Sequence, residues 1–163
     1  GNTRRIILAD TLLENFSQDE IEVVLAHELG HHVHRHMARG ILLQSATVLG
    51  GCYLLHRILE VFGTRWELTG PADFANLPLL WLAVTALSLL LMPWVNSYSR
   101  HMERQADAYA LRATRNRPAF ISSMEKLARQ NLAQRRPHPL MEFIFHSHPS
   151  IEKRIAFAQQ KSY

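Results

Sequence analysis

The feature that most constrains the fold is a run of nineteen residues without a charged side chain, Leu77–Val95. At about 1.5 Å per residue, a helix of this length covers most of a hydrocarbon core about 30 Å thick. A second apolar stretch, Ile41–Phe62, is interrupted by His56 and Arg57, which can reach the membrane surface near its end. The two stretches predict a membrane-associated helical hairpin over residues 41–95. The alternative is a buried core helix, or a hairpin that covers a partner.

The charges around these two stretches are distributed unequally. The segment from Arg57 to Asn76 carries two basic residues, Arg57 and Arg65, and three acidic ones, Glu60, Glu67 and Asp73. The flanks at the other ends of the two stretches carry four arginines: Arg35, Arg39, Arg100 and Arg104. Because basic residues favour the cytoplasmic side of a membrane, this distribution predicts that both chain ends face the cytoplasm.

Composition excludes some functions and favours others. The formal net charge is +4, but no basic run is interleaved with aromatic residues, so nucleic-acid binding is not expected. A single cysteine, Cys52, rules out a disulfide within the chain. Five of the ten histidines fall between His27 and His36, and such a local cluster indicates metal binding.

Local patterns predict a mainly helical chain with one short strand. The β-branched run Arg5–Ala9 predicts the strand, and its place before a metal-binding helix suits an edge on which an extended substrate binds. Ser17 and Glu20 form the pattern of a capping box, which predicts a helix from about Gln18 to Met37. Further helical segments are expected at Leu12–Phe16, from Asn96 (as the cap) to about Thr114, from Pro118 to about Gln134, and at Ile151–Gln160.

The chemistry is concentrated in the segment His27-Glu28-Leu29-Gly30-His31, which has the pattern HExxH. Residues four apart lie on one face of a helix, so both imidazoles can reach one ion. A catalytic zinc site uses three protein ligands and keeps one position for water. Glu28 follows the first ligand and is the expected general base. Two ligands are too few, so a third must come from elsewhere.

Glu103 and Asp107 are the candidates for completing the site. They lie four residues apart on a predicted helix, so they share a face, as a ligand and its supporting carboxylate would. Taken alone, the pair is more typical of a solvated face beside Arg100 and Arg104. Together with the HExxH segment, it favours Glu103 as the third zinc ligand.

These residues resemble a known family. The segments Arg4–His34 (RRIILADTLLENFSQDEIEVVLAHELGHHVH) and Ser99–Ala110 (SRHMERQADAYA) are similar to metallopeptidase family 48, the membrane enzymes that include CAAX prenyl protease 1 and HtpX. The resemblance implies that His27, His31 and Glu103 bind zinc and that Glu28 is the general base. Asp107 would then orient a ligand histidine through its second ring nitrogen.

A third segment of the resemblance lies near the C-terminus. His148-Pro149, with Arg154 six residues after the histidine, is similar to an element of the same family. The resemblance implies that His148 hydrogen-bonds the oxyanion of a tetrahedral intermediate and that Arg154 supports the substrate or nearby acidic residues. A donor of this kind contributes about 3–4 kcal/mol to catalysis. A helix-capping position without a catalytic role is the alternative for His148.

The expected fold is therefore a mainly α (α+β) zincin-like domain over residues 1–163, cut from a longer chain, with an inserted hairpin at 41–95. It would bind one Zn²⁺ and cleave membrane-associated or misfolded proteins in a bacterial inner or plasma membrane, in contact with lipid and with its site facing the cytoplasm. A CAAX-type prenyl-protein protease and a latent zinc-binding membrane scaffold with a chaperone-like role are the alternatives. The chain offers two spans at most, which puts prenylated substrates in doubt. The sequence does not indicate an oligomeric state.

Overall fold

The computed structural model describes residues 10–65, 73–132 and 134–161. Within these ranges the chain forms seven α-helices and one 3-10 turn, and it forms no strand. The mainly α fold class is confirmed for this part of the chain. The strand predicted at residues 5–9 lies outside the described residues.

The first two helices begin at or near the predicted residues. α1 (Asp10–Asn15) precedes α2 (Gln18–Val33), and Ser17 and Glu20 form the expected capping box. Glu20 is buried and also binds Lys126, with 2.6 Å between Oε2 and Nζ. Burial alone would raise the pKa of Glu20, but hydrogen bonds from Lys126 and Ser122 lower it to about 2. The start of α2 is therefore tied to α5 by an ion pair that persists through the neutral range.

The end of α2 differs from the prediction. The helix was expected to reach Met37, but it ends at Val33, and Arg35 adopts a left-handed backbone with φ of 54°. α3 (His36–Arg65) begins immediately afterwards in a new direction. A left-handed residue other than glycine costs about 1–2 kcal/mol, so the surrounding contacts must hold this break.

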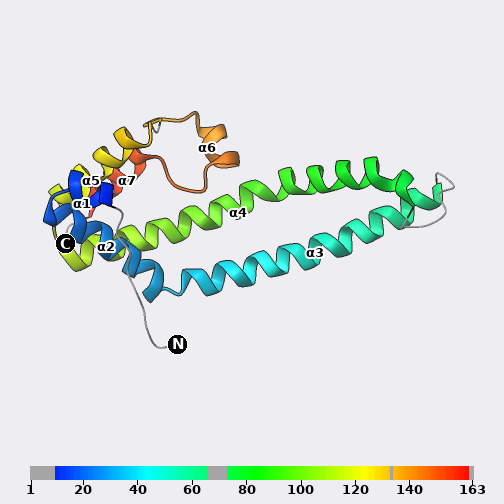
Figure 1. The fold of residues 1–163 in the computed structure, drawn as a ribbon, viewed down its shortest axis with the longest axis horizontal. Helices are drawn as coiled ribbons and strands as arrows, with labels where there is room; N and C mark the ends of the chain where they lie inside the picture. The colour runs from blue at the N-terminus through cyan, green and yellow to red at the C-terminus, as the bar shows by residue number, and fades with distance from the viewer. Residues whose placement is uncertain (1–9, 66–72, 133, 162–163) are drawn as a thin grey trace.

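α3 and α4 form the long hairpin of Figure 1. η1 (Phe74–Asn76) leads into α4 (Leu77–Thr114), which runs unbroken past Pro93. The prediction of a separate helix capped by Asn96 is wrong, because Asn96 lies inside α4, where its Nδ2 donates to the carbonyl of Ile144 at 2.6 Å. His36–Gly63 and Phe74–Thr114 are long and apolar enough to cross a membrane.

The remaining helices complete a compact cluster at the other end of α4. α5 (Arg117–Gln130) packs beside α2, and α7 (Ile151–Gln160) packs on α5 and α4. α6 (Pro139–Phe145) lies against α4 at the end of a loop (Figure 1). α5 ends four residues earlier than expected, α6 was not predicted, and α7 has the expected bounds. The core of the cluster consists of small and apolar side chains from α2, α4, α5 and α7: Val23, Ala26, Ala110, Leu111, Ala119, Phe120, Met124 and Ala158.

Two names are used below for the two parts of the molecule. The hairpin is α3 together with residues 77–95 of α4. The head is α1, α2, residues 96–114 of α4, and α5 to α7. α4 thus belongs to both parts, and its second half packs along α2.

Candidate metal centre

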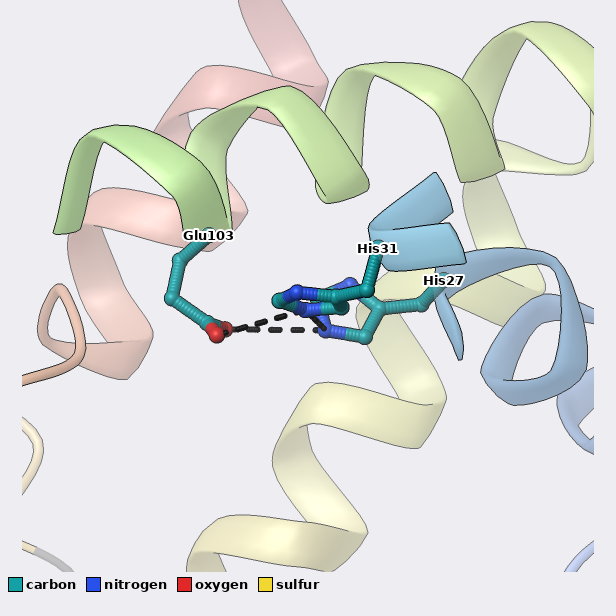
Figure 2. Close-up of side chains that lie close together, drawn as sticks. All are labelled: His27, His31 and Glu103. Atoms are coloured by element: carbon teal, nitrogen blue, oxygen red, sulfur yellow. Dashed lines mark hydrogen bonds and ion pairs between the residues drawn. The ribbon is translucent and has the colours of Figure 1, made fainter. Parts of the chain in front are cut away.

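Three of the predicted site residues meet where α2 packs on α4. Figure 2 shows His27 and His31, from α2, facing Glu103 of α4. The Nε2 atoms of the two histidines are 3.2 Å apart, and Glu103 carboxylate oxygens lie 3.5 Å from Nε2 of His27 and 3.3 Å from Nε2 of His31. Within the described residues, these are the His, Cys, Asp and Glu side chains that converge closely enough to hold one ion.

The distances suit a single small cation. Two atoms that each lie about 2.0–2.1 Å from a tetrahedral ion are separated by roughly 3.3 Å, and the three observed separations bracket this value. Two imidazole nitrogens and one carboxylate are a donor set typical of zinc and of several other transition metals. The residues present therefore fit a transition-metal ion.

A close contact between the two helices brings these side chains together. Gly30 is buried, and a Cβ added to it would lie 2.9 Å from Cα of Ala106 and 3.1 Å from Cβ of Tyr109. Because Gly30 has no side chain, α2 approaches the α4 backbone between Glu103 and Asp107. Sequence reasoning assigned Gly30 no role, although a glycine inside an otherwise good helix indicates such a contact.

A buried ion pair between Asp107 and Arg154 contacts the ring of His27 at Nδ1. This Nδ1 lies 2.9 Å from Oδ1 of Asp107, which is 1% exposed, and Arg154 donates to both oxygens of Asp107, with Nε 2.8 Å from Oδ2. The sequence placed all three near the site, and the structure brings them into contact. A carboxylate on the second ring nitrogen fixes the orientation of a ligand histidine.

This environment controls the proton on His27. Burial lowers the pKa of the imidazole, but hydrogen bonds to Asp107 and Glu103 outweigh burial and raise the pKa to about 9. Without a metal ion, His27 is therefore protonated at neutral pH. A cation that binds here has to displace that proton, so its affinity rises with pH below about 9.

Comparison with known proteins identifies the chain. The profile described as "Peptidase family M48" matches residues 1–162. The chain belongs to peptidase family M48. The resemblance inferred from the HExxH and Glu103 segments is thereby confirmed, and family membership implies a metal.

Individual relatives agree with this family. The chain is 34% identical to "Uncharacterized metalloprotease YhfN" of Bacillus subtilis over 99% of its own length and 39% of that protein. It is 33% identical to "CAAX prenyl protease 1 homolog" of Arabidopsis thaliana, covering 93% and 36% of the two chains. "Protease HtpX" of Acinetobacter baylyi is 28% identical, over 98% of this chain and 58% of that one. The chain thus spans well under two thirds of each relative.

A solved structure has the same fold. The crystal structure of S. mikatae Ste24p matches 94% of this chain and 39% of its own, with a TM-score of 0.78 and 26% identity. The match covers the head and the hairpin together, so their relative arrangement recurs in another protein.

Glu28 and His148 are the two further residues that the sequence predicts for the site. The side chain of Glu28 is exposed beside His27 in the chain, which leaves its carboxylate open to solvent. Nε2 of His148 lies 3.5 Å from Oε1 of Glu103, and its Nδ1 is 2.9 Å from Oγ of Ser147. A cavity of about 490 Å³ adjoins His148 and Arg154, with Leu127, Phe145 and Ile151 in its wall.

A buried network that sequence reasoning missed holds the loop before α7. Arg100 lies among the basic residues that flank the hairpin, yet it is buried, and it donates to the carbonyls of Glu142 at 3.0 Å and His146 at 2.5 Å. The carboxylate of Glu142 accepts from the backbone N–H of Ser150 at 3.1 Å and pairs with Lys153 at 2.9 Å. These contacts lie on both sides of His148 along the chain and so position it.

Proposed function

We propose that this chain forms the catalytic part of a zinc-dependent endopeptidase. The observation that carries the proposal is the convergence of His27, His31 and Glu103 within 4.8 Å of one another, in a chain that belongs to a peptidase family. Two histidines and a glutamate are the ligand set of a catalytic zinc site that keeps one position open.

The residues around the ion divide the chemistry between them. When bound, zinc would polarise the scissile carbonyl and make a water molecule more acidic. Glu28 takes a proton from the attacking water and passes it to the leaving amine. His148, held by the Arg100 and Glu142 network, donates to the oxygen on which negative charge develops. Arg154 keeps Asp107 ionised and oriented against His27.

The hairpin supports a membrane setting for this activity. Its large apolar side chains are exposed to solvent in the structure, among them Leu42, Leu49, Trp81 and Trp94. A soluble monomer rarely presents so continuous an apolar surface, whereas a bilayer would cover it. In the proposed arrangement residues 1–163 form one catalytic unit, the hairpin lies in an inner or plasma membrane, and the head faces the cytoplasm, where basic flanks are favoured.

The proposed substrates are peptide bonds in membrane-associated or misfolded proteins. The cavity beside His148 has an apolar wall, which suits a hydrophobic side chain of an extended or unfolded segment. A CAAX-type prenyl-protein protease is the second candidate, favoured by the 33% identity to a relative of that name. The same cleavage assay with prenylated and unprenylated peptides separates the two.

The decisive experiment separates metal binding from catalysis. Glu28→Gln removes the base without removing a ligand, so we expect the purified chain in detergent to keep its zinc but to cleave an unfolded substrate about 10²–10⁴ times more slowly. Zinc is measured by elemental analysis and cleavage by peptide release, each with and without a chelator. Glu22→Gln is the matched control, because Glu22 is exposed on the same helix.

Two results would contradict the proposal. Undiminished cleavage by Glu28→Gln removes Glu28 from the reaction. Zinc binding by the unchanged chain without any chelator-sensitive cleavage favours the latent scaffold with a chaperone-like role.

A further inference from the structure

A second hydrogen-bonded pair of histidines, His31 and His36, connects the metal centre to the start of α3. Nδ1 of His31 is 3.0 Å from Nδ1 of His36, and Nε2 of His36 is 3.0 Å from Oε1 of Gln105. His36 is 4% exposed, although it begins the helix that leaves the head. The ring of His34 stacks on that of His36, with centroids 5.5 Å apart and planes 17° apart. The His36 ring is thus fixed in place and in orientation.

The break between α2 and α3 makes this contact possible. On a continuous helix, residues five apart are separated by about 140° around the axis, so His36 would point away from His31. The left-handed backbone at Arg35 turns the chain, and the first residue of α3 faces back towards α2. The left-handed conformation of Arg35 therefore allows the contact between the imidazoles of His31 and His36.

The three side chains specify where their protons lie. The carbonyl oxygen of Gln105 accepts, so Nε2 of His36 carries a proton and its Nδ1 has a free lone pair. That lone pair accepts from His31, which must then carry its proton on Nδ1. Nε2 of His31 is left unprotonated, and this is the atom that faces His27 and Glu103. If the donor and acceptor roles in this chain of hydrogen bonds were reversed, Nε2 of His31 would carry the proton and could not bind a metal ion.

We infer that Gln105 and His36 are positioning residues that fix the tautomer and orientation of His31 as a metal ligand. The inference rests on the proposed function, because it concerns the same metal centre. It also distinguishes the two ligand histidines. A buried carboxylate, Asp107, supports His27, whereas a neutral imidazole backed by an amide supports His31. The two rings are held by partners of different charge, which limits the negative charge gathered around one ion.

Two nearly isosteric variants of His36 test the contact. In His36→Asn the side-chain oxygen can occupy the position of Nδ1 and accept from His31, whereas His36→Leu has a similar shape and no acceptor. We expect His36→Leu to bind zinc about 10–100 times more weakly and His36→Asn to recover most of that loss. Zinc affinity is measured by chelator competition on the full chain in detergent, and the cobalt absorption spectrum reports the ligand geometry. His32→Leu is the control, because His32 is exposed near the end of the same α2 helix.

The outcomes separate positioning from packing and from the proposed function. The inference is overturned if His36→Leu binds zinc as tightly as the unchanged chain, or if the leucine and asparagine variants are equally weak while their circular dichroism shows intact helices. Should His36→Leu fail to fold, Gln105→Leu and Gln105→Glu decide. Weaker zinc binding by Gln105→Leu, but not by Gln105→Glu, supports the inference. Equal zinc binding by these two Gln105 variants overturns it. If the unchanged chain binds no zinc, the proposed function fails first, which is a visibly different result.

Discussion

The two halves of α4 place their side chains in opposite environments. In the hairpin half, Trp81 is 79% exposed and Trp94 is 69% exposed, and the large apolar residues face outward. In the head half, the charged residues Glu103 and Asp107 are buried beside alanines that pack on α2. One continuous helix therefore exposes apolar groups along its first half and buries ionised groups along its second.

This difference shows which interactions hold each half. A buried carboxylate is tolerated only when it is paired. In the head, each buried carboxylate meets a histidine, an arginine or a lysine. An exposed apolar helix is tolerated only when its solvent is itself apolar, as in a bilayer. The head is thus specified by particular partners, whereas the hairpin is specified by hydropathy. Substitutions should accordingly have local, partner-dependent effects in the head and general, solvent-dependent effects in the hairpin.

The largest effect is expected from removing one partner in the head. Arg154→Met keeps much of the side-chain volume but leaves Asp107 buried without its guanidinium, so we expect the metal-free chain to lose about 3–5 kcal/mol of stability. Guanidinium unfolding in detergent measures this loss. Arg135→Met is the matched control, since it removes an exposed pair with Glu125, and it should cost under about 1 kcal/mol. Equal losses in the two variants would show that the head does not depend on its buried pairs.

A second, smaller effect should appear only when a membrane is present. Leu89 is exposed near the middle of the apolar run, and Leu89→Lys should weaken partition into lipid vesicles by about 3 kcal/mol, or roughly 100-fold. Flotation of the chain with vesicles measures the partition. Leu132→Lys makes the same exchange at a position in the head that is 93% exposed, and it should leave partition unchanged. If both lysines act alike, the hairpin is not the part that enters the bilayer.

Features that depend on local pattern could be predicted from the sequence. The capping box of Ser17 and Glu20, the spacing of His27 and His31, and the spacing of Glu103 and Asp107 each follow from the geometry of one helix. The apolar run likewise follows from hydropathy over a single segment. For these features the chain needs no information about distant residues, so a short window of sequence is enough.

Features that depend on tertiary contact could not be predicted in this way. The break at Arg35 has no glycine or proline to mark it, and a helix through Met37 is the local expectation. Asn96 has a good capping side chain, but its partner is a carbonyl 48 residues away, so the local cap does not form. The contacts of His36 with His31 and Gln105 exist only after the break and the packing of α2 on α4. The sequence therefore indicated the residues that converge at the candidate site and the contact of Asp107 with a histidine, but not the contacts of His31 with His36 and of His36 with Gln105.

The smallest effect compares the two parts directly through their glycines. Gly30→Ala would put a Cβ 2.9 Å from the α4 backbone, so the gain in helix propensity should be outweighed by overpacking, for a net loss of about 1–2 kcal/mol. Gly50 lies in α3 with nothing within 4 Å of an added Cβ, so Gly50→Ala should instead stabilise by about 0.5–1 kcal/mol. Opposite signs in unfolding experiments would show that tight packing governs the head and not the hairpin. Because Gly30 sets the separation of the ligand helices, its variant should also bind zinc more weakly, whereas the Gly50 variant should bind zinc as the unchanged chain does. A Gly30→Ala chain with unaltered stability and zinc affinity would mean that α2 and α4 can move apart without disturbing His27, His31 and Glu103.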